Sequence, residues 1–344
     1  MEYENETLTQ EARTAMNAHF PDHDTIRTAL SLATRAPSIH NSQPWRWRVC
    51  DESLHLYADP DRHLPNVDPD SRDLLLSCGI ALHHAVVALA ALGWHAKVHR
   101  FPNPGEPQHL ASIEVRPQVP GEVDIVLAAA IPRRRTDRRL YNSWCVPEAD
   151  IALMGARAAR CGVMLREVAL LPKLQHIVAE AVQQHVADDD YLRELTAWSG
   201  RHASLAGVPA RNTPESNPHA AIPGRLFAGP ALAQPPEVSP EDDSATVLAL
   251  GTKDDSPLAR LRAGEATSLT LLTATALGLA CCPVTEPLEI PETREALRED
   301  VFGDSGYPQM LLRIGWAPVN ADPLPSTPRR ALSDVVEWPD YSVD

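Results

Sequence analysis

Residues 36–45 read APSIHNSQPW and interrupt two regular segments, so they decide the order of elements in the first part of the chain. Residues 22–35 before them carry apolar side chains at helical spacing. Pro37 and Pro44 cannot continue that helix, because proline lacks a backbone N–H and fixes its own φ. The segment that follows, WRWRV, alternates apolar and polar residues as a half-buried strand does. A helix, a polar turn and a strand are therefore expected in this order.

The same patterns extend along the rest of the chain. Ile26, Ala29, Leu30 and Ala33 form the apolar stripe of the first helix, and Asp24 is placed to cap its start. The further helices that we expect are 72–92, 149–161, 174–195 and 258–279. The expected strands are 45–49, 54–58, 95–101, 109–117, 163–168, 246–252 and 309–317. This mixture predicts an α+β fold with mainly antiparallel sheets around two long central helices.

The two longest predicted helices belong to an internal repeat. Residues 77–98 match residues 262–284, since each stretch has a glycine, a run of small apolar residues, AALG or ATALG, and then a strand. Small residues allow another helix to approach closely, which suits a central packed pair. Chance similarity between two alanine-rich helices is the alternative. The recurring order of helix, strand, long helix and strand around both stretches favours a true repeat.

Residues 199–240, which we call the Pro-rich segment, contain eight prolines and no clear periodicity. A structureless stretch of this length in a compact chain is usually a functional lid or is disordered. It lies between a predicted helix and a predicted strand, so it can fold back over the junction of the two repeats. The side chains in or beside it that can pack on or pair with a ligand are Trp198, Arg201, Arg211, Arg225 and Phe227.

Composition excludes several classes of function. The 344 residues suffice for two domains, and the net charge of −15 argues against a nucleic-acid or anionic-membrane binder. The acidic N-terminal sequence lacks the features of a secretory signal, and the apolar run 80–93 is too short to span a bilayer, so we expect a cytoplasmic protein. The six cysteines form neither a disulfide framework nor a zinc spacing, and we expect buried thiols and no metal.

Two basic stretches indicate an anion. Residues 133–139 read RRRTDRR, which is five arginines in seven residues of an acidic protein. Guanidinium groups match phosphate oxygens with paired hydrogen bonds, and the threonine hydroxyl adds a donor. A solvated turn with local ion pairs is the alternative. The pair Arg329–Arg330, after the last predicted strand, is weak support on its own.

The turn after the first helix gathers neutral hydrogen-bonding side chains, including Ser38, His40, Asn41 and Gln43. Such a turn suits a ligand with a polar ring edge, for example a flavin. A plain polar loop is the alternative when the turn is considered alone. His40 is singled out by its position only, because the 14 histidines show no metal-binding spacing.

Together these stretches resemble the nitroreductase family of flavoproteins. The family's APSxxNxQPW motif is matched by residues 36–45, its basic-x-Ser/Thr-x-basic motif by 134–138, and its ALGL helix with a following proline by 276–283. The resemblance implies a nitroreductase-like α+β fold and an FMN cofactor that NAD(P)H reduces. The FMN-binding residues that it implies are Arg134, Thr136, Arg138, Arg329 and Arg330 at the phosphate, Pro37, Ser38 and Asn41 in the turn, and Pro283, Val284, Thr285 and Glu286 after the second long helix.

The order of these motifs departs from the family. An ordinary member carries the arginine motif before APSxxNxQPW, whereas here it follows in the second half of the chain. Family homodimers take the two motif sets from opposite subunits. The resemblance therefore implies two fused halves, 1–125 and 126–344, that mimic a homodimer with one complete flavin site and one degenerate site. The arrangement is similar to the Acg branch, linked with hypoxic dormancy in actinobacteria, and the Pro-rich segment resembles that branch's lid.

The chemistry that the resemblance implies takes place on the flavin, so we assign no catalytic side chain. Family members often carry an acidic residue and a glycine near the flavin N5 edge. The matching positions here are Thr285 and Glu286, and the glycine is missing. Three functions stay open: an FMN-dependent oxidoreductase that reduces a nitro compound, quinone or other small electrophile, an FMN-binding or storage protein with an occluded flavin, and a fold that serves only as an interaction surface. Whether the fused chain dimerises again also stays open.

Overall fold

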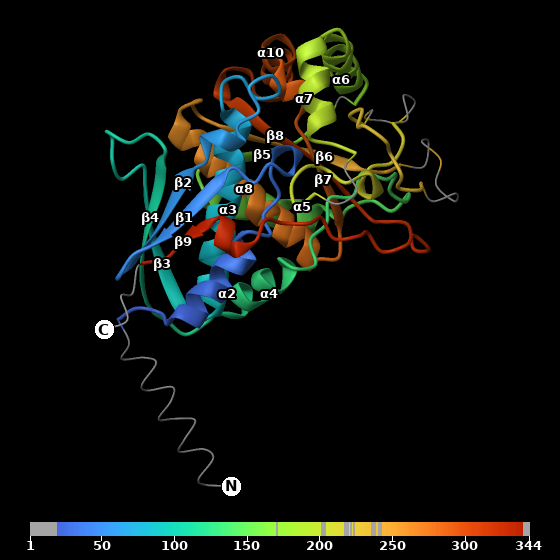
Figure 1. Cartoon of the computed structure of the whole chain (residues 1–344). Helices are drawn as coiled ribbons and strands as arrows, with labels where there is room; N and C mark the ends of the chain where they lie inside the picture. The colour runs from blue at the N-terminus through green and yellow to red at the C-terminus, as the bar shows by residue number, and fades with distance from the viewer. Residues whose placement is uncertain are drawn as a thin grey trace.

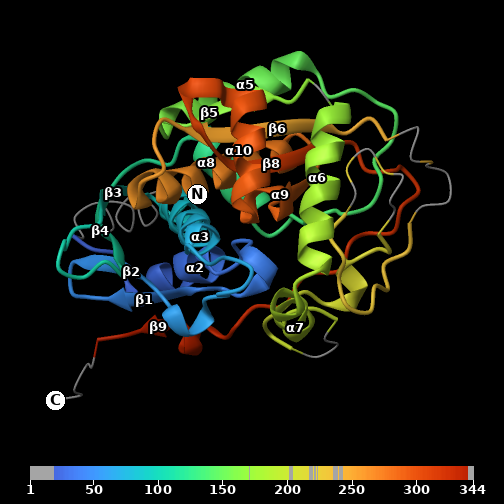
Figure 2. The ribbon, with the colours of Figure 1, turned by 90° about the horizontal axis from the view of Figure 1, so that it is seen from above.

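The computed structural model describes residues 19–169, 171–200, 204–216, 220, 222, 224–234, 239 and 243–339. Within these residues the strands form a five-stranded sheet in the order β3-β4-β2-β1-β9 and a four-stranded sheet in the order β5-β6-β8-β7. Two long helices, α3 and α8, lie between the two sheets (Figures 1 and 2). The α+β class expected from the sequence is confirmed.

The first sheet collects strands from both ends of the chain. Its members are β1 (Trp45–Val49), β2 (Ser53–Ala58), β3 (Trp94–Arg100), β4 (His109–Pro117) and β9 (Val336–Glu337). The pairs β1–β2, β2–β4 and β3–β4 are antiparallel, whereas β9 runs parallel to β1. Strands β1 to β4 of this sheet precede residue 125, and β9 comes from the C-terminal end of the described chain. The boundary at residue 125 stays a prediction.

The second sheet is antiparallel throughout. It contains β5 (Met164–Glu167), β6 (Thr246–Thr252), β7 (Ala280–Val284) and β8 (Tyr307–Gly315). Residues on β8 are buried along nearly its whole length, because helices cover the sheet. The three strands predicted over 163–168, 246–252 and 309–317 are all present. Their ends differ from the predicted ends by at most two residues.

The helices are α2 (His23–Ala33), α3 (Arg72–Ala91), α4 (Glu122–Ala130), α5 (Glu148–Arg160), α6 (Leu171–Val186), α7 (Asp189–Ala197), α8 (Pro257–Ala276), α9 (Glu286–Glu289) and α10 (Pro291–Leu297). Four of the five predicted helices are present, the fifth is divided in two, and α4, α9 and α10 were not predicted. The single helix predicted over 174–195 is wrong, because Asp188 accepts hydrogen bonds from the first amides of α7 and starts a new helix. Asp24 does not cap α2; Asp22 Oδ1 accepts from Thr25 N at 2.7 Å instead.

The crossing of α3 and α8 depends on two glycines. A Cβ atom on Gly79 would lie 2.1 Å from the Leu261 carbonyl oxygen, and one on Gly264 would lie 2.2 Å from the Leu76 carbonyl oxygen. Any larger residue at either position would push the helices apart, since both clashes are with backbone atoms. These glycines occupy equivalent positions in the two stretches that we matched in the sequence, and each approaches the backbone of the other helix.

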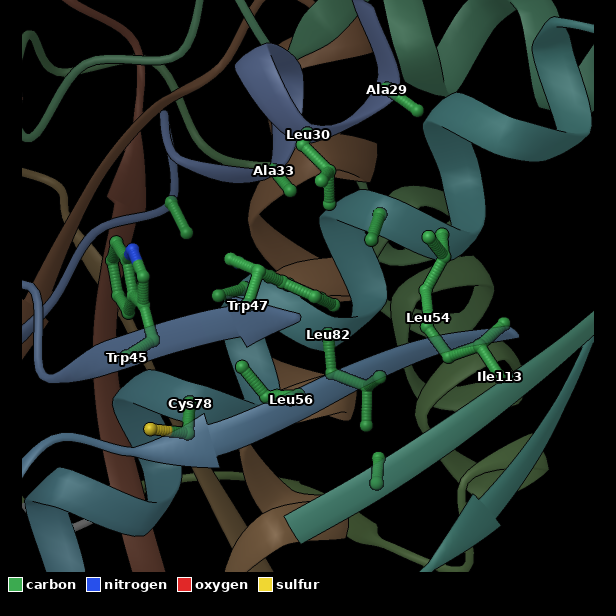
Figure 3. Close-up of a cluster of buried hydrophobic side chains, with 14 of the residues drawn as sticks. Ala29, Leu30, Ala33, Trp45, Trp47, Leu54, Leu56, Cys78, Leu82 and Ile113 are labelled. Carbon is green, nitrogen blue, oxygen red and sulfur yellow. The ribbon is translucent and has the colours of Figure 1, made fainter. Parts of the chain in front are cut away.

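Apolar packing on both sides of α3 and α8 holds the two layers together. Figure 3 shows Leu30 of α2, Trp47 of β1 and Leu82 of α3 pointing into one cluster with Ile113 of β4. By length and composition, α3 is long and apolar enough to cross a membrane, so the apolar stretch is longer than the run 80–93 considered in the sequence. However, 78% of the most apolar part of this helix is buried inside the protein. Cys78, Cys281 and Cys282 are buried as expected, whereas Cys145 is exposed and Cys50 and Cys161 are partly exposed.

Candidate functional site

The turn after α2 is held in an unfavourable backbone conformation. His40, Asn41 and Gln43 have φ values of 44°, 55° and 55°, which side-chain-bearing residues rarely adopt. Hydrogen bonds to two serine hydroxyls hold the turn, because Ser38 Oγ accepts from Gln43 N at 2.9 Å and Ser77 Oγ accepts from Ile39 N at 3.1 Å. Strain of this kind persists only where the surroundings over-determine it, and it gathers at functional sites.

Two side chains of this turn connect distant segments instead of facing a cavity. Asn41 Nδ2 donates to the carbonyl oxygens of Gly207 at 3.1 Å and Pro328 at 3.2 Å. Gln43 Nε2 donates to the Leu205 carbonyl oxygen at 2.9 Å, and Gln43 Oε1 accepts from Arg330 N at 2.8 Å. The APSIHNSQPW motif thus ties the Pro-rich segment and the C-terminal residues to the first half.

A large cavity is lined by residues from both sides of position 125, with a volume of about 1250 Å³ including its open mouth. Its walls come from the turn (Pro37, Ser38, Ile39, His40), α3 (Asp73, Leu76, Ser77, Ile80), the loop before α5 (Thr136, Arg138, Leu140), residues 282–286, β8 (Met310, Arg313) and the Pro-rich segment (Val208, Pro214, Glu215, Ser216, Ala220, Ile222, Gly224, Arg225, Phe227, Gln234). The motifs that lie far apart in the sequence therefore meet around one space.

A smaller cavity of about 300 Å³, which we call the arginine pocket, adjoins the large one. It is lined by Arg35, Ile131, Arg134, Arg135, Thr136, Thr327 and Arg329. Thr136 lines both cavities, so the two spaces share a wall. Among the residues that the structure describes, the lining of this pocket contains four guanidinium groups and no carboxylate.

The charges of the arginine pocket are poorly compensated. The Nε atoms of Arg35, Arg134 and Arg135 are buried and have no hydrogen-bond partner within the described part of the chain. Burial lowers the pKa of Arg134, and the neighbouring guanidinium groups of Arg135, Arg138 and Arg35 lower it further. Burial and the same cluster lower the pKa of Arg329 to about 9. Groups that destabilise one another in this way favour an anion between them.

The predicted site residues separate into three groups. Pro37, Ser38, Thr136, Arg138, Pro283, Val284, Thr285 and Glu286 line the large cavity, and Arg134, Thr136 and Arg329 line the arginine pocket. Asn41 and Arg330 are in neither lining. Arg330 Nη1 lies 3.3 Å from Asp59 Oδ2, because that buried carboxylate draws its guanidinium into the first half. Arg329 donates from Nε, Nη1 and Nη2 to five carbonyl oxygens, so it offers the pocket charge but few free N–H groups.

The Pro-rich segment contributes Arg225 to the wall of the large cavity. Arg225 Nη1 donates to His40 Nε2 at 2.7 Å, Nη2 donates to Thr285 Oγ1 at 3.1 Å, and Nη2 also pairs with Glu289. Burial opposes the charge of Arg225, but Glu289, Tyr191 and Glu286 outweigh it and raise its pKa. Phe227 also lines the cavity, with Arg138 stacked 5.0 Å from its ring centroid.

Trp198 and Arg211, which the sequence also indicated, lie outside the cavity lining. Trp198 lies under the guanidinium of Arg62 at 5.1 Å. Arg211 donates to the Ser326 carbonyl oxygen at 3.4 Å, and Arg201 is outside the described residues. Of the four of these side chains that the structure describes, Arg225 and Phe227 line the cavity.

Asp73 is a site residue that the sequence patterns did not indicate. It lines the large cavity from the first turn of α3, and its side chain is 3% exposed. Arg72 Nη2 lies 2.9 Å from Asp73 Oδ1, yet neither carboxylate oxygen has a partner with hydrogen-bond geometry in the described residues. Burial raises the pKa of Asp73 to about 8. Acidic residues are common in the first turn of helices in general, so nothing in the sequence marks Asp73 as a site residue.

Comparison with known proteins shows the family to which the chain belongs. No protein-family model matches it. The Mycobacterium tuberculosis protein named "Putative NAD(P)H nitroreductase Rv3131" is 68% identical over 326 residues, which cover 95% of this chain and 95% of that protein. The chain belongs to the nitroreductase family. Another family member, "Putative NAD(P)H nitroreductase acg" of the same organism, is 37% identical over 320 residues, which cover 91% of this chain and 95% of that protein.

These relatives confirm the resemblance to the nitroreductase family and to its Acg branch. Among solved structures, the FMN-dependent nitroreductase NfnB from Mycobacterium smegmatis in complex with NADPH is 15% identical, with 62% of this chain and 99% of that chain covered and a TM-score of 0.37. The nitroreductase-family chain described here carries its cavity between segments of one polypeptide.

Proposed function

We propose that this chain binds one FMN across its two halves and passes electrons from NAD(P)H to a small electrophile. The observation that carries the proposal is the arginine pocket, which shares Thr136 with the large cavity. A ligand with a phosphate at one end and a ring at the other matches this pair of spaces. The phosphate group would occupy the arginine pocket and the ring the large cavity, with the ribityl chain passing Thr136.

The arginine pocket suits a phosphate on chemical grounds. A phosphate monoester carries about −1.5 to −2 charges near neutral pH and three strong acceptor oxygens. The buried Nε atoms of Arg35, Arg134 and Arg135 lack acceptors within the described residues. A buried cation without a partner is costly, and a bound dianion would remove that cost for several guanidinium groups at once.

The large cavity suits an aromatic ring. Cofactor sites are mostly apolar with a few polar groups that fix orientation. Leu76, Ile80, Ile222 and Val284 supply apolar wall here, and Ser38 and Thr285 are among its polar groups. Bound FMN would supply the hydride chemistry, while these residues position the ring and limit the access of water. We place this activity in the cytoplasm, as expected from the sequence.

The test is the flavin content of the purified chain. We expect a yellow protein whose absorbance shows bound oxidised flavin, and a calorimetric titration of the flavin-free chain that ends at one FMN per chain. A colourless protein that binds no added FMN would refute the proposal. Two FMN per chain would contradict the single composite site, because it would mean that the second, degenerate site is also functional.

The Pro-rich segment favours a second candidate, in which FMN is held with little turnover. Val208, Ile222, Arg225 and Phe227 from this segment line the cavity, and Arg225 is held by Glu289. A reductase needs one flavin face open to NAD(P)H and then to substrate. If the segment acts as a lid over that face, reduction is slow in the intact chain.

Stopped-flow reduction by NADPH separates the two candidates. We expect the FMN-loaded full chain to be reduced slowly and a variant lacking residues 203–236 to be reduced faster, with FMN retained through the arginine pocket. Equal and fast reduction of both proteins would reject the storage candidate and favour the plain oxidoreductase. Loss of FMN from the shortened variant would instead show that the segment holds the cofactor itself.

A further inference from the structure

His40 is held in a fixed position in the wall of the large cavity. Its side chain lines the cavity, the residue is 6% exposed, and its backbone is held at a φ of 44°. The rings of His40 and Phe227 form a T-shaped pair with centroids 6.0 Å apart. A strained backbone and a packed ring fix the direction of both ring nitrogens.

The tautomer of His40 follows from its contact with Arg225. Arg225 Nη1 lies 2.7 Å from His40 Nε2. A guanidinium group has donors and no acceptor, so Nε2 must be the acceptor. A neutral imidazole with an accepting Nε2 carries its proton on Nδ1. Arg225 is itself held by Thr285 and Glu289, and its position therefore does not depend on His40 alone.

The surroundings of His40 keep the ring neutral. The charged or titratable groups that face it are Arg225 from the Pro-rich segment, Arg138 from the loop before α5 and His185 from α6. Burial lowers the pKa of His40 well below its ordinary value, and these three groups lower it further. Across the neutral pH range His40 is therefore a fixed N–H donor and not a cation.

The remaining donor of His40 lacks a partner. Nδ1 is buried and makes no hydrogen bond to any residue that the structure describes. Buried N–H groups in native proteins are nearly always paired, so an unpaired one at a cavity wall indicates a ligand atom. The cations of Arg138 and Arg225 both act on the ring, which favours an acceptor that carries negative charge.

We propose that the His40 Nδ1–H group donates a hydrogen bond to the edge of the flavin ring that becomes negatively charged on two-electron reduction. This inference rests on the proposed function, since it requires FMN in the large cavity. His40 would then favour reduced FMN over oxidised FMN by binding the reduced ring more tightly. It would assist electron uptake from NAD(P)H without transferring a proton.

Two substitutions separate this role from a merely structural one. In His40→Gln the side-chain amide reaches the former position of Nε2, so it can accept from Arg225, but it has no donor at the Nδ1 position. In His40→Asn the amide nitrogen takes the Nδ1 position, and the acceptor for Arg225 is lost. Asparagine also tolerates a positive φ, which makes this variant compatible with the turn.

The measurement is the midpoint potential of bound FMN in the full chain, with the dissociation constant of oxidised FMN taken by calorimetry. For His40→Gln we expect the preference for reduced over oxidised FMN to fall about ten- to a hundredfold, which for a two-electron couple is a potential about 30–60 mV more negative. For His40→Asn we expect the potential to stay close to that of the wild type. A His40→Gln potential that is unchanged or more positive, or equal shifts in both variants, would overturn the assignment.

A second test uses the wild-type chain and so does not depend on whether a variant folds. With ¹⁵N-labelled histidine, the His40 ring should show a protonated Nδ1 and an unprotonated Nε2 between about pH 5.5 and 8, and FMN should shift the Nδ1 resonance most. A His40 ring that titrates in this range, or that carries its proton on Nε2, contradicts the inference. Failure of FMN to bind the wild type refutes the proposed function as well, whereas normal binding with an unchanged Nδ1 resonance refutes only the role of His40.

Discussion

Two sets of arginines line two adjoining cavities and differ in whether a carboxylate pairs with them. Arg313 Nη2 lies 2.7 Å from Asp243 Oδ2, and Arg225 pairs with Glu289. Arg134 and Arg135, a short distance along the wall, have no carboxylate partner among the described residues. The first set is satisfied by the protein itself, and the second set is complete only with an external anion.

The difference shows how to separate structural arginines from ligand-binding ones. A buried ion pair satisfies both partners, so removing one partner leaves an uncompensated charge. An unpaired buried arginine is already uncompensated, and removing it costs the free protein little while the ligand loses a contact. Stability and affinity should therefore respond in opposite ways in the two sets.

The largest effect is expected for the paired set. Arg313→Ala leaves the Asp243 carboxylate, whose side chain is 1% exposed, without its cation. We expect the free energy of unfolding of the flavin-free chain to fall by about 3–5 kcal/mol in urea titrations. The control is Arg27→Ala, which breaks an exposed pair with Asp24 and should cost no more than about 0.5 kcal/mol. Equal small losses in both variants would contradict the structural role of Arg313.

An intermediate effect is expected at Arg72 and Asp73, where a cation is present but both carboxylate oxygens lack hydrogen bonds in the described residues. Burial raises the pKa of Asp73 from 3.8 in the unfolded chain to about 8. The stability that comes from its proton is fully present below about pH 4 and is lost as pH rises through about 8. Asp73→Asn should therefore gain stability over the wild type between pH 5 and pH 9, by about 1–2 kcal/mol.

Urea unfolding at pH 5, 7 and 9 checks this expectation. Asp68 is buried beside Asp73, and burial raises its pKa to about 7, so the titration belongs to both groups. Asp61→Asn, at a carboxylate that is 81% exposed, is the matched control and should follow the wild-type pH profile. Parallel profiles for Asp73→Asn and the wild type would show that Asp73 is ionised throughout.

The smallest effect is expected for the unpaired set without ligand. Arg134→Ala removes a buried cation that lies close to other guanidinium groups. We expect the flavin-free chain to keep its stability or to gain up to about 1 kcal/mol, because removing one cation relieves the repulsion among the remaining guanidinium groups. Thermal unfolding of both proteins in low salt provides the measurement. A loss of stability comparable with that of Arg313→Ala would mean that Arg134 has a structural partner.

The parts of the site that the sequence indicated are those carried by short motifs. Ser38, Arg134, Thr136, Arg138 and the 283–286 stretch were predicted, because motif spacing fixes which residues follow a given helix or strand. Their meeting around one space is what the hypothesis of two fused halves predicts. The fold was predictable for similar reasons, since small residues at helical spacing indicated the central pair α3 and α8.

The remaining features depend on tertiary partners that no local pattern reveals. Arg330 belongs to the same motif as Arg329, yet Asp59 from another part of the chain draws it away from the pocket. Asn41 turns toward the Gly207 and Pro328 carbonyl oxygens for the same kind of reason. Arg35 acquires its role from the arginines that the fold brings beside it, and Asp73 acquires its role from burial. Neither can be read from alternation or spacing.

The central claim is that the unpaired arginines bind the phosphate of FMN, and calorimetry with FMN and riboflavin tests it most directly. Riboflavin has the same ring and no phosphate. We predict that Arg134→Ala weakens FMN binding about ten- to a hundredfold, as expected for loss of a charge-assisted hydrogen bond, and leaves riboflavin affinity unchanged. Arg133→Ala, an exposed neighbour in the same motif, is the control and should bind both flavins as the wild type does. Equal weakening of FMN and riboflavin by Arg134→Ala, or no weakening of either, would contradict the account.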